Sequence, residues 1–570
     1  MSDERSRTWS ESLQFWQSAI RAAFVATSVL TSGQGCGTEG PVLSTNPEST
    51  GDASGADAMR AADQTSGQTA QDGATDHGGS NAVDGAAGDG GTAGGGDGNG
   101  LGDAAGSGDG GAGMTGGGGD GGWPTPTAIC GTSILNGPTS APAGAVTLSP
   151  GASTIQNAIA AHPNGGTTYY LTAGTYPINS PINPNNNDTF IGAPGAVIDG
   201  SSTQQVAFGL NDHATGVTLK YLTIEHFAGP QNNGIVNQGQ GAGWTIQYCT
   251  IRDNLDQNGG ANGIMLGDNN VASYNCVTGN AQTGISSDGS TGFVVDRNEI
   301  SSNGVGYEAA HPCGCSGGMK FFTSTKGTLT NNWIHDNGSI GLWIDTNNSF
   351  FLLRGNVIEK NENEGIMYEI SYNGVIEDNV IQFNGIAGNV TVSDFTEPSI
   401  YVSESGGYDA GAAVMLSGID VNGVLRIANN LFYDNADGVT LYQNASRCCG
   451  SQDGCSTSCT TLPLYSEVDA HGNKRWNTQN VTVSNNTFTN DSDAGCTTQP
   501  SKHNYCVVTG LFSTAMSIDQ AIAFQQNNVF ENNTYTGPWQ FLSPDQSSSL
   551  MPPATWQAAP FNQDRGSVFH

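Results

Sequence analysis

Between Leu222 and Phe530 the hydrophobic and polar residues repeat one short phrase. Asn, or a residue in its place, is followed by two mostly apolar residues, and most copies lead into a segment that starts with Gly and an apolar residue. Intervals without insertions are 23 to 27 residues long, and a fixed period of this length predicts a solenoid. The phrase starts at Leu222, Cys249, Asn275, Asn298, Asn332, Asn356, Asn379, Asn430, Asn486 and Asn528.

Each period has the content of three short strands. In residues 350–371 one strand is predicted to end at Asn356, a second at Asn361, and a third to begin at Gly365. We therefore expect an all-β fold, a single-stranded right-handed parallel β-helix of about ten coils. A leucine-rich repeat would require a recurring LxxLxL frame, which this chain lacks. Stacked Asn amides hydrogen-bond from coil to coil, and Asn tolerates the left-handed backbone of a tight corner.

A short helix is predicted at the N-terminal end of this solenoid. Ser153 and Gln156 have the spacing of a capping box, and Ile155, Ala158 and Ile159 recur at helical spacing. Such a helix would cover the open end of the core.

Three further segments resemble the pectin-lyase-like superfamily. They are TTYYLTAGTYPINSPI (167–182), VIDGS (197–201) and TWQAAPFNQDRGSVF (555–569). The resemblance extends over most of residues 140–570 and implies the β-helix fold. It does not imply one reaction, because this fold carries lyases, hydrolases, epimerases and non-catalytic adhesins.

Composition divides the chain into a tether and a folded part. Residues 37–122 contain 29 Gly and no Phe, Trp or Tyr, so they cannot bury enough apolar surface to fold, and we expect a flexible linker. Residues 123–570 are expected to form the β-helix domain as a monomer. The formal net charge of -34 argues against nucleic acid as a partner, because phosphates would be repelled.

The first 36 residues have the layout of an export signal. Arg5, Arg7 and Arg21 precede the apolar run 22–30, and Cys36 follows. Cys36 before a Gly-rich tether resembles a bacterial lipoprotein, which implies lipidation at Cys36 and a place at the outer membrane or cell surface. Ordinary secretion and a cytosolic chain with a fortuitous apolar run are the alternatives. No later stretch reaches 18 apolar residues, so the membrane is expected as a partner only through this anchor.

The other 11 cysteines favour disulfides over zinc. Several cluster in predicted loops, and no paired CxxC spacing is present. Cys249 and Cys276 lie at or next to register positions, so we expect them to be buried core residues instead.

The Gly-apolar strands bring ionisable residues together. If side chains alternate along each strand, two outward columns place Asp288, Lys320, Asp345 and Glu369 on four consecutive coils, with Trp343 beside them. Insertions at 304–316, 386–410 and 443–478 are expected to project around the same face, where binding often occurs. His311 lies in the first insertion, and Tyr442 ends a strand of the same face.

A lyase on uronate-containing polysaccharide is the activity that these residues favour. Lys320 would be the base, with Asp345 and Glu369 as catalytic partners; polysaccharide lyases of this fold typically use Lys or Arg in that role. Asp288, Asp345 and Glu369 at rung spacing could hold calcium, which would neutralise the developing charge. Trp343, Tyr442 and His311 would contact the sugar.

Three other interpretations stay open. A glycoside hydrolase would use a carboxyl pair, either Asp345 with Glu369 at roughly 5 Å or Asp288 with Asp345 at roughly 9 Å. A non-catalytic carbohydrate-binding or adhesive solenoid would need no reactive pair. Finally, outward charges on neighbouring strands often form ion pairs without function. The sequence does not identify the sugar.

Overall fold

The computed structural model describes residue 126 and residues 128–209, 213–255, 260–307, 315–386, 398–408, 411–443, 477–490, 507–513, 516–542 and 550–570. No helix within these ranges is long and apolar enough to cross a membrane. The predicted boundaries at residues 36 and 122, the lipidated Cys36, and most of the three insertions with His311 lie outside the described residues.

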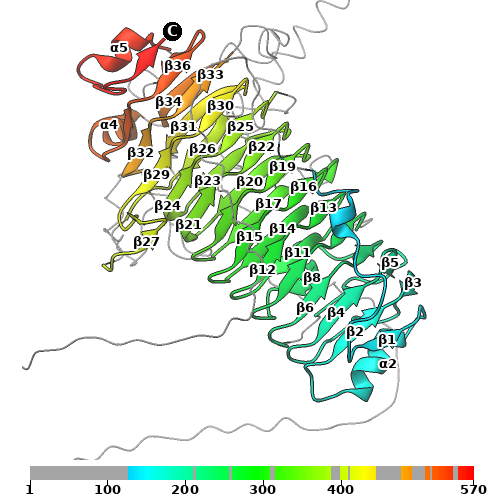
Figure 1. Ribbon diagram of the computed structural model, residues 1–570. Helices are drawn as coiled ribbons and strands as arrows, with labels where there is room; N and C mark the ends of the chain where they lie inside the picture. Colours follow the sequence, from blue (N-terminus) through cyan, green and yellow to red (C-terminus); the bar gives the residue numbers. More distant parts are fainter. Residues whose placement is uncertain are drawn as a thin grey trace, which may run out of the picture. The chain divides into compact units, whose positions relative to one another are not determined.

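Three long parallel sheets wind around one core (Figure 1). Sheet A contains, in order, β1 (Val146–Leu148), β2 (Thr168–Leu171), β4 (Thr189–Gly192), β6 (Thr218–Lys220), β9 (Thr245–Gln247), β12 (Val271–Ser273), β15 (Val294–Asp296), β18 (Thr328–Thr330), β21 (Ser349–Arg354), β24 (Tyr372–Glu377), β29 (Leu425–Ala428), β32 (Val481–Ser484) and β35 (Val529–Glu531).

Sheet B follows sheet A in each coil. It contains β3 (Gly174–Pro177), β5 (Ala196–Asp199), β7 (Thr223–Glu225), β10 (Thr250–Arg252), β13 (Cys276–Thr278), β16 (Glu299–Ser301), β19 (Trp333–His335), β22 (Val357–Glu359), β25 (Val380–Gln382), β30 (Leu431–Tyr433), β33 (Thr487–Thr489), β36 (Thr534–Thr536) and β38 (Val568–Phe569).

Sheet C completes the coil. It contains β8 (Gly234–Gln238), β11 (Asn262–Leu266), β14 (Thr283–Asp288), β17 (Gly317–Phe322), β20 (Ile340–Asp345), β23 (Ile366–Glu369), β26 (Pro398–Ser403), β31 (Asp437–Gln443), β34 (Val508–Ser513) and β37 (Gln540–Leu542). A parallel β-helix with three strands per coil is therefore confirmed, although sheets A and B have thirteen strands rather than about ten, because coils without the Asn phrase precede Leu222.

Alternation along short strands builds the core. In a three-residue strand the middle side chain points inward, so Ile251, Ile300, Ile334 and Ile358 stack at 0% exposure along sheet B. Stacking of equivalent residues on successive coils forms one continuous apolar cluster from Leu148 to Trp556. The repeat seen in the sequence is therefore the repeat of the core.

Asn side chains close the corner between sheets A and B. The amide of Asn332 donates to Asn356 Oδ1 at 3.0 Å and to the carbonyl of Val295 at 2.9 Å, while Asn332 Oδ1 accepts from Asn298. We call this series the A–B Asn ladder: Asn275, Asn298, Asn332, Asn356, Asn379, Asn430, Asn486 and Asn533. A second ladder, at the B–C corner, contains Asn254, Asn280, Asn303, Asn337, Asn361, Asn384 and Asn435.

Two details of the predicted corner are wrong. The left-handed residue is the one before each ladder Asn, for example Tyr274 at φ 55° and Asp378 at φ 56°, so the Asn itself is not left-handed. The last phrase, at Asn528, does not join the ladder; Asn486 donates instead to Asn533, whose corner follows β35. The phrase was matched to the wrong end of that strand.

Helices cover both ends of the described solenoid (Figure 1). The predicted N-terminal helix is α2 (Thr154–Ala161), with Ile155 and Ile159 buried against the first coils. Its capping box is absent, because the Ser153 side chain makes no cap hydrogen bond and Gln156 donates to Ser180 O. At the other end lie α4 (Met516–Phe524) and α5 (Pro553–Gln557), which buries Trp556 fully. The small elements are η1 (Ser133–Leu135) and the hairpin β27 (Met415–Leu416) with β28 (Ile419–Asp420).

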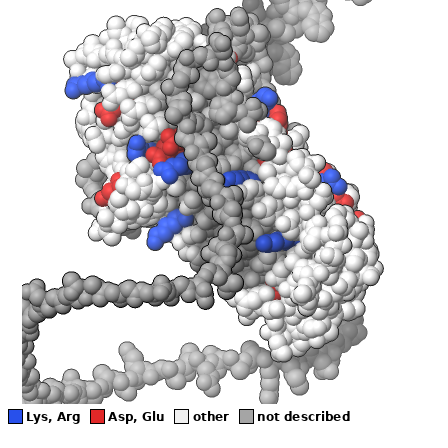
Figure 2. Space-filling model, viewed as in Figure 1, with Lys and Arg blue, Asp and Glu red and all other residues white. Residues whose placement is uncertain are grey.

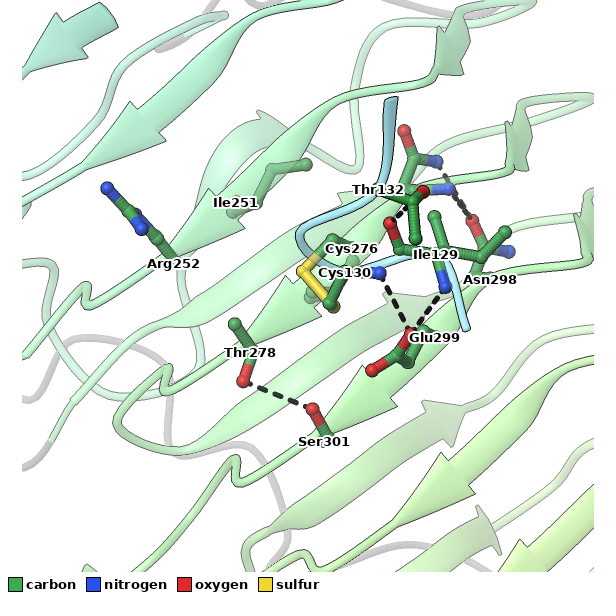
Figure 3. The surroundings of a disulfide bond; sticks show 12 residues. Ile129, Cys130, Thr132, Ile251, Arg252, Cys276, Thr278, Asn298, Glu299 and Ser301 are labelled. Atoms are coloured by element: carbon green, nitrogen blue, oxygen red, sulfur yellow. Dashed lines mark hydrogen bonds between the residues drawn. A yellow bond between two sulfur atoms is a disulfide. The ribbon is translucent and has the colours of Figure 1, made fainter. Parts of the chain in front are cut away.

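A disulfide fixes the first described segment to the flank of the solenoid (Figure 3). Cys130 bonds to Cys276 at the start of β13, and Glu299 of β16 accepts the backbone N–H groups of Ile129 at 2.6 Å and Cys130 at 2.8 Å. We call residues 129–145 the N-terminal strap. Cys276 is thus buried but disulfide-bonded, which corrects the expectation of a simple core residue.

The other described cysteines agree with the prediction. Cys315 is disulfide-bonded. Cys249 is free and fully buried, and burial raises the pKa of its thiol to about 12. Cys249 is therefore a core residue.

Candidate functional site

The predicted outward columns of sheet C are present. Lys320 of β17 lies beside Trp343 of β20, and Trp343 lies beside Met367 of β23. In the second column Asp345 follows Phe322, and Glu369 lies one rung further on. The structure therefore brings Lys320, Asp345, Glu369 and Trp343 together on three consecutive strands.

Two contacts hold the ammonium group of Lys320. Its Nζ lies 3.1 Å from Asp345 Oδ2 and 3.6 Å from the centroid of the Trp343 ring. The Phe322 ring is further away, at 5.9 Å. An anion and the face of an indole are both partners for a positive charge, and the Lys320 side chain is 12% exposed. These contacts hold the Lys320 ammonium group in one place on the outward face of sheet C.

Asp345 is almost fully buried, with its side chain 2% exposed. Its Oδ1 accepts from the hydroxyl of Thr346 at 2.7 Å, and its Oδ2 faces Lys320. Burial raises the pKa of Asp345 to about 6; the Lys320 charge opposes this rise, and the nearby Glu369 adds to it. The carboxyl therefore gains and loses its proton much closer to neutral pH than an ordinary Asp.

Trp343 positions its neighbours rather than offering a stacking surface. It is 5% exposed, one ring face lies under Lys320, and its Nε1 donates to Glu369 Oε2 at 3.0 Å. The predicted role as a sugar-stacking platform is not supported by this arrangement. The indole instead links the Lys320–Asp345 pair to the carboxylate of the next rung.

Asp288 does not join this group. Phe322 lies between Asp288 and Asp345 in the column, so the two carboxylates are two rungs apart, roughly 10 Å. Asp288 is exposed and accepts from the hydroxyl of Thr323 at 2.7 Å.

The three carboxylates predicted to hold calcium do not fit that ion. Both oxygens of Asp345 already have donors or a cation, and Lys320 itself occupies the position beside Asp345. Within the ranges that the structure describes, no three His, Cys, Asp or Glu side chains are arranged to bind a metal. A positive charge is present here, but a lysine supplies it.

A small cleft opens next to Lys320 on the side of the earlier coils. Side chains from strands β11, β14 and β17 and from the turns before β8 and β14 line it, and most are neutral amides or hydroxyls. Gln282 and Asn232 hydrogen-bond to each other, and Thr283 donates to Asn262 at 2.5 Å, so the polar wall is pre-organised. The lining residues are Asn232, Asn262, Met265, Gln282, Thr283, Ser286, Ser287, Asp288, Lys320 and Phe322.

Several of these residues were not predicted as functional. Asn262, Gln282 and Thr283 precede the Gly-apolar pair of their strands, and the alignment of strands began only at that Gly. A column drawn through the residues just before the Gly would have found them. We call the cleft together with the outward face of sheet C the groove.

On the later coils an aromatic ladder lines the groove. The rings of Tyr401, Tyr442 and Phe512 follow one another with centroids 5.5 Å apart. Tyr442 was predicted to contact substrate, and it lies on this ladder. Tyr401 was missed because the insertion at 386–410 removes its strand from the regular spacing; the residue pairs with Met367 and Thr440.

Several other charged residues of the described solenoid form pairs on sheets A and B. The face seen in Figure 2 is mostly uncharged, with small groups of adjacent basic and acidic atoms. Arg354 and Arg426 contact Glu377 on sheet A, and Arg252 contacts Glu225 on sheet B. His335 is 12% exposed between Glu299 and Asp336 and stacks on Trp333. These pairs stabilise the flanks and lie away from the groove sheet.

Comparison with known proteins agrees with the fold. Residues 233–407 match a family model described as a right handed beta helix region, which supplies the hand of the solenoid. The resemblance to right-handed β-helix proteins is therefore confirmed. No curated protein matches the sequence.

Solved structures include β-helix enzymes with low identity. The A-module of a mannuronan C-5 epimerase from Azotobacter vinelandii is 17% identical, with a TM-score of 0.47, over 73% of this chain and 94% of that one. A family 6 polysaccharide lyase from Pseudopedobacter saltans is 12% identical, with a TM-score of 0.44, over 75% and 92%. The catalytic unit of an alpha-1,3-glucanase from Streptomyces thermodiastaticus is 14% identical, with a TM-score of 0.43, over 76% and 69%.

Proposed function

We propose that the groove binds a uronate-containing polysaccharide and cleaves it by β-elimination, with Lys320 at the reacting sugar. The observation that carries this proposal is the Lys320 ammonium group, held at 3.1 Å from Asp345 and 3.6 Å from Trp343 beside a cleft of amides and hydroxyls. A fixed cation suits a sugar carboxylate, and neutral amides and hydroxyls suit sugar hydroxyl groups.

The reaction needs a positive charge and a base at the same place. The ammonium form of Lys320 would attract the sugar carboxylate on binding. The free amine would become ammonium again as it takes the proton next to that carboxylate, beside the negative charge that develops there. The base must be the free amine. Asp345 lies within reach of the Lys320 proton, and its pKa of about 6 makes it a better proton acceptor than an ordinary carboxylate.

In this scheme the atoms balance as follows. Lys320 passes one proton to Asp345 and then takes the proton from the carbon next to the sugar carboxylate. The electrons of that C–H bond form a carbon–carbon double bond, the bond to the leaving glycosidic oxygen breaks, and that oxygen takes a proton from solvent. Asp345 then returns its proton to solvent, which restores the pair of ammonium and carboxylate.

Variants of Lys320 separate charge from basicity. Arginine keeps the positive charge but gives up its proton far less readily than lysine, whereas methionine provides neither a charge nor a base. We expect Lys320→Arg to bind the polymer within about threefold of wild type and to form unsaturated product at least about 100-fold more slowly, and Lys320→Met to lose both binding and product. Lys326→Met, at an exposed position, is the matched control.

The assay measures the ultraviolet absorbance of unsaturated uronate ends and, in parallel, total reducing ends. If no uronate polymer yields unsaturated ends, elimination is ruled out. Binding without any product would leave a non-catalytic carbohydrate-binding or adhesive solenoid. If Lys320→Met retained full rate, another group would be the base.

A glycoside hydrolase is the second candidate, for one reason. Asp345, with its pKa of about 6, lies one rung from Glu369, and a pair with one carboxyl neutral near pH 6 has the character of an acid and its partner base. Its signature is reducing ends without unsaturated ends. We expect Asp345→Asn to abolish hydrolysis in that case.

We also propose that the protein is exported and held at the cell surface through a lipid on Cys36. The Cys130–Cys276 disulfide supports an oxidising compartment, because such bonds rarely persist in the cytosol. Incorporation of labelled fatty acid into the wild type, and its loss in Cys36→Ser, would test the anchor. Full chain in the soluble cytosolic fraction would contradict export.

A further inference from the structure

The groove has a single positive charge among its described strands. Lys320 is the only Lys or Arg in the ten strands of sheet C, from β8 to β37. The ionisable acids on its outward columns are Asp288 on one side of Lys320, and Asp345 and Glu369 on the other. The described groove therefore places a cation beside one sugar carboxylate only. Carboxylates on the adjacent sugars of the polymer would lie beside acidic side chains.

The spacing of the rungs makes this arrangement selective. Rungs are roughly 4.8 Å apart, which is comparable to the length of one sugar residue in an extended chain. A polymer lying along sheet C thus places successive sugars near successive strands. In a polymer of uronates alone, the carboxylates next to the one on Lys320 would lie near Asp288 or Glu369.

The later coils disfavour an anion further along. Burial is the main reason that the pKa of the Tyr401 phenol lies well above its ordinary value, and the nearby Tyr442, Glu404 and Glu364 contribute to the rise. The same surroundings would penalise a sugar carboxylate. In contrast, Tyr442 and Phe512 of the ladder are less buried than Tyr401, and their ring edges and the Tyr442 hydroxyl suit the C–H and O–H groups of a neutral sugar.

On the earlier coils the groove also favours neutral sugars over a second carboxylate, for another reason. Asn262, Gln282 and Thr283 are neutral, and they are already oriented by hydrogen bonds. The nearest charge on that side is the exposed carboxylate of Asp288. Neutral sugars can hydrogen-bond to these groups, whereas a second carboxylate would meet Asp288.

We propose that the preferred ligand is a polysaccharide in which single uronate residues are separated by neutral sugars, with one uronate at Lys320 and neutral sugars on both sides. This inference rests on the proposed function, because it assumes that the groove binds a uronate. It goes further by defining the charge pattern of the polymer.

A single homopolyuronate with graded chemical reduction of its carboxyl groups to neutral sugars is the direct probe. Binding of the full-length protein is measured at fixed ionic strength along this series. We expect affinity to be highest at an intermediate carboxyl content, and the fully charged polymer to bind about tenfold more weakly than the best one. Affinity that rises steadily to full charge would overturn this inference and leave the proposed function intact. Tightest binding by the fully reduced polymer would contradict the proposed function itself.

A charge reversal inside the groove sharpens the test. Asp288→Lys adds a second cation two rungs from the Asp345 position on an exposed side chain, so the fold should tolerate it. We expect the affinity maximum to move to a higher carboxyl content. Asp420→Lys makes the same change of charge on the exposed hairpin strand β28, where we expect no shift of the maximum. Identical behaviour of the two variants would overturn the inference.

Discussion

The A–B corner and the outward face of sheet C are formed by the same coils, but they use the repeat in opposite ways. At the corner the same residue returns from Asn275 to Asn379 on each successive coil, with the same amide hydrogen bonds. On sheet C the residue aligned with Lys320 is Ser286 on one side and Trp343 on the other. Repetition therefore marks what builds the solenoid, and departures from it mark the candidates for chemistry.

Breaking the corner should have the largest effect on stability. Asn332→Ala would remove the side-chain partner of the buried Val295 carbonyl and of the backbone N–H of Asn298, whereas Asn356 Oδ1 would keep the backbone N–H of residue 332. With about 1 to 3 kcal/mol for each unsatisfied buried group, partly offset by water entering, we expect a loss of about 4 kcal/mol in the free energy of unfolding. Denaturant unfolding measures it. A loss below about 1 kcal/mol would mean that the ladder only follows the fold and does not stabilise it.

The groove should differ from the corner because the stability contributed by Asp345 depends on pH. The pKa of Asp345 rises from 3.8 to about 6 on folding, so between these values the folded chain holds more protons than the unfolded one. Stability contributed by this group is therefore present at low pH and falls as the pH rises toward 6, by about 3 kcal/mol.

The variant Asp345→Asn should lack this slope. Comparing the urea midpoints of wild type and variant from pH 4 to pH 7 isolates the contribution, because other acids with raised pKa, such as Asp188 and Asp564, are common to both. Parallel curves for the two proteins would contradict the assignment.

The disulfide that holds the N-terminal strap should contribute a smaller amount to the free energy of unfolding. Replacing both Cys130 and Cys276 by Ser removes the covalent link but keeps the Glu299 hydrogen bonds to the strap. We expect a loss of about 2 kcal/mol and rapid proteolysis confined to residues 129–145, with the solenoid still intact. If cleavage spread into sheet A or B at once, the disulfide would be needed for the coils themselves.

Removal of an exposed ion pair should have the smallest effect on the free energy of unfolding. Arg252 contacts Glu225 at 2.8 Å, but its side chain is 46% exposed. We expect Arg252→Ala to change the free energy of unfolding by less than about 1 kcal/mol. A loss comparable to that of Asn332→Ala would remove the contrast between the corner and the surface.

The sequence predicted what the repeat controls. The three strands per coil and the alignment of Lys320, Trp343, Asp345 and Glu369 followed from a period of 23 to 27 residues and alternation along each strand. The second corner was readable too, because its Asn lies five residues after that of the first, as in Asn332 and Asn337.

Properties that depend on contacts across coils were not predictable. Spacing shows that Asp345 lies next to Lys320, but not that Asp345 is buried or that the Trp343 ring is covered by the ammonium group. Pairing of Cys130 with Cys276 spans 146 residues and depends on the path of the strap. Tyr401 was missed because an insertion hid its strand. Spacing also did not show that Lys320 and Thr346 engage the two oxygens of Asp345, one of the carboxylates predicted to hold calcium.

The central claim is that Lys320 meets a sugar carboxylate, and one binding comparison tests it most directly. Wild type and Lys320→Met are titrated with a uronate polymer that has intermediate carboxyl content and with the same polymer fully reduced to neutral sugars. We predict that the substitution weakens binding to the charged polymer about tenfold or more, and leaves binding to the neutral polymer unchanged. Equal affinities of the two proteins for the charged polymer would contradict the claim.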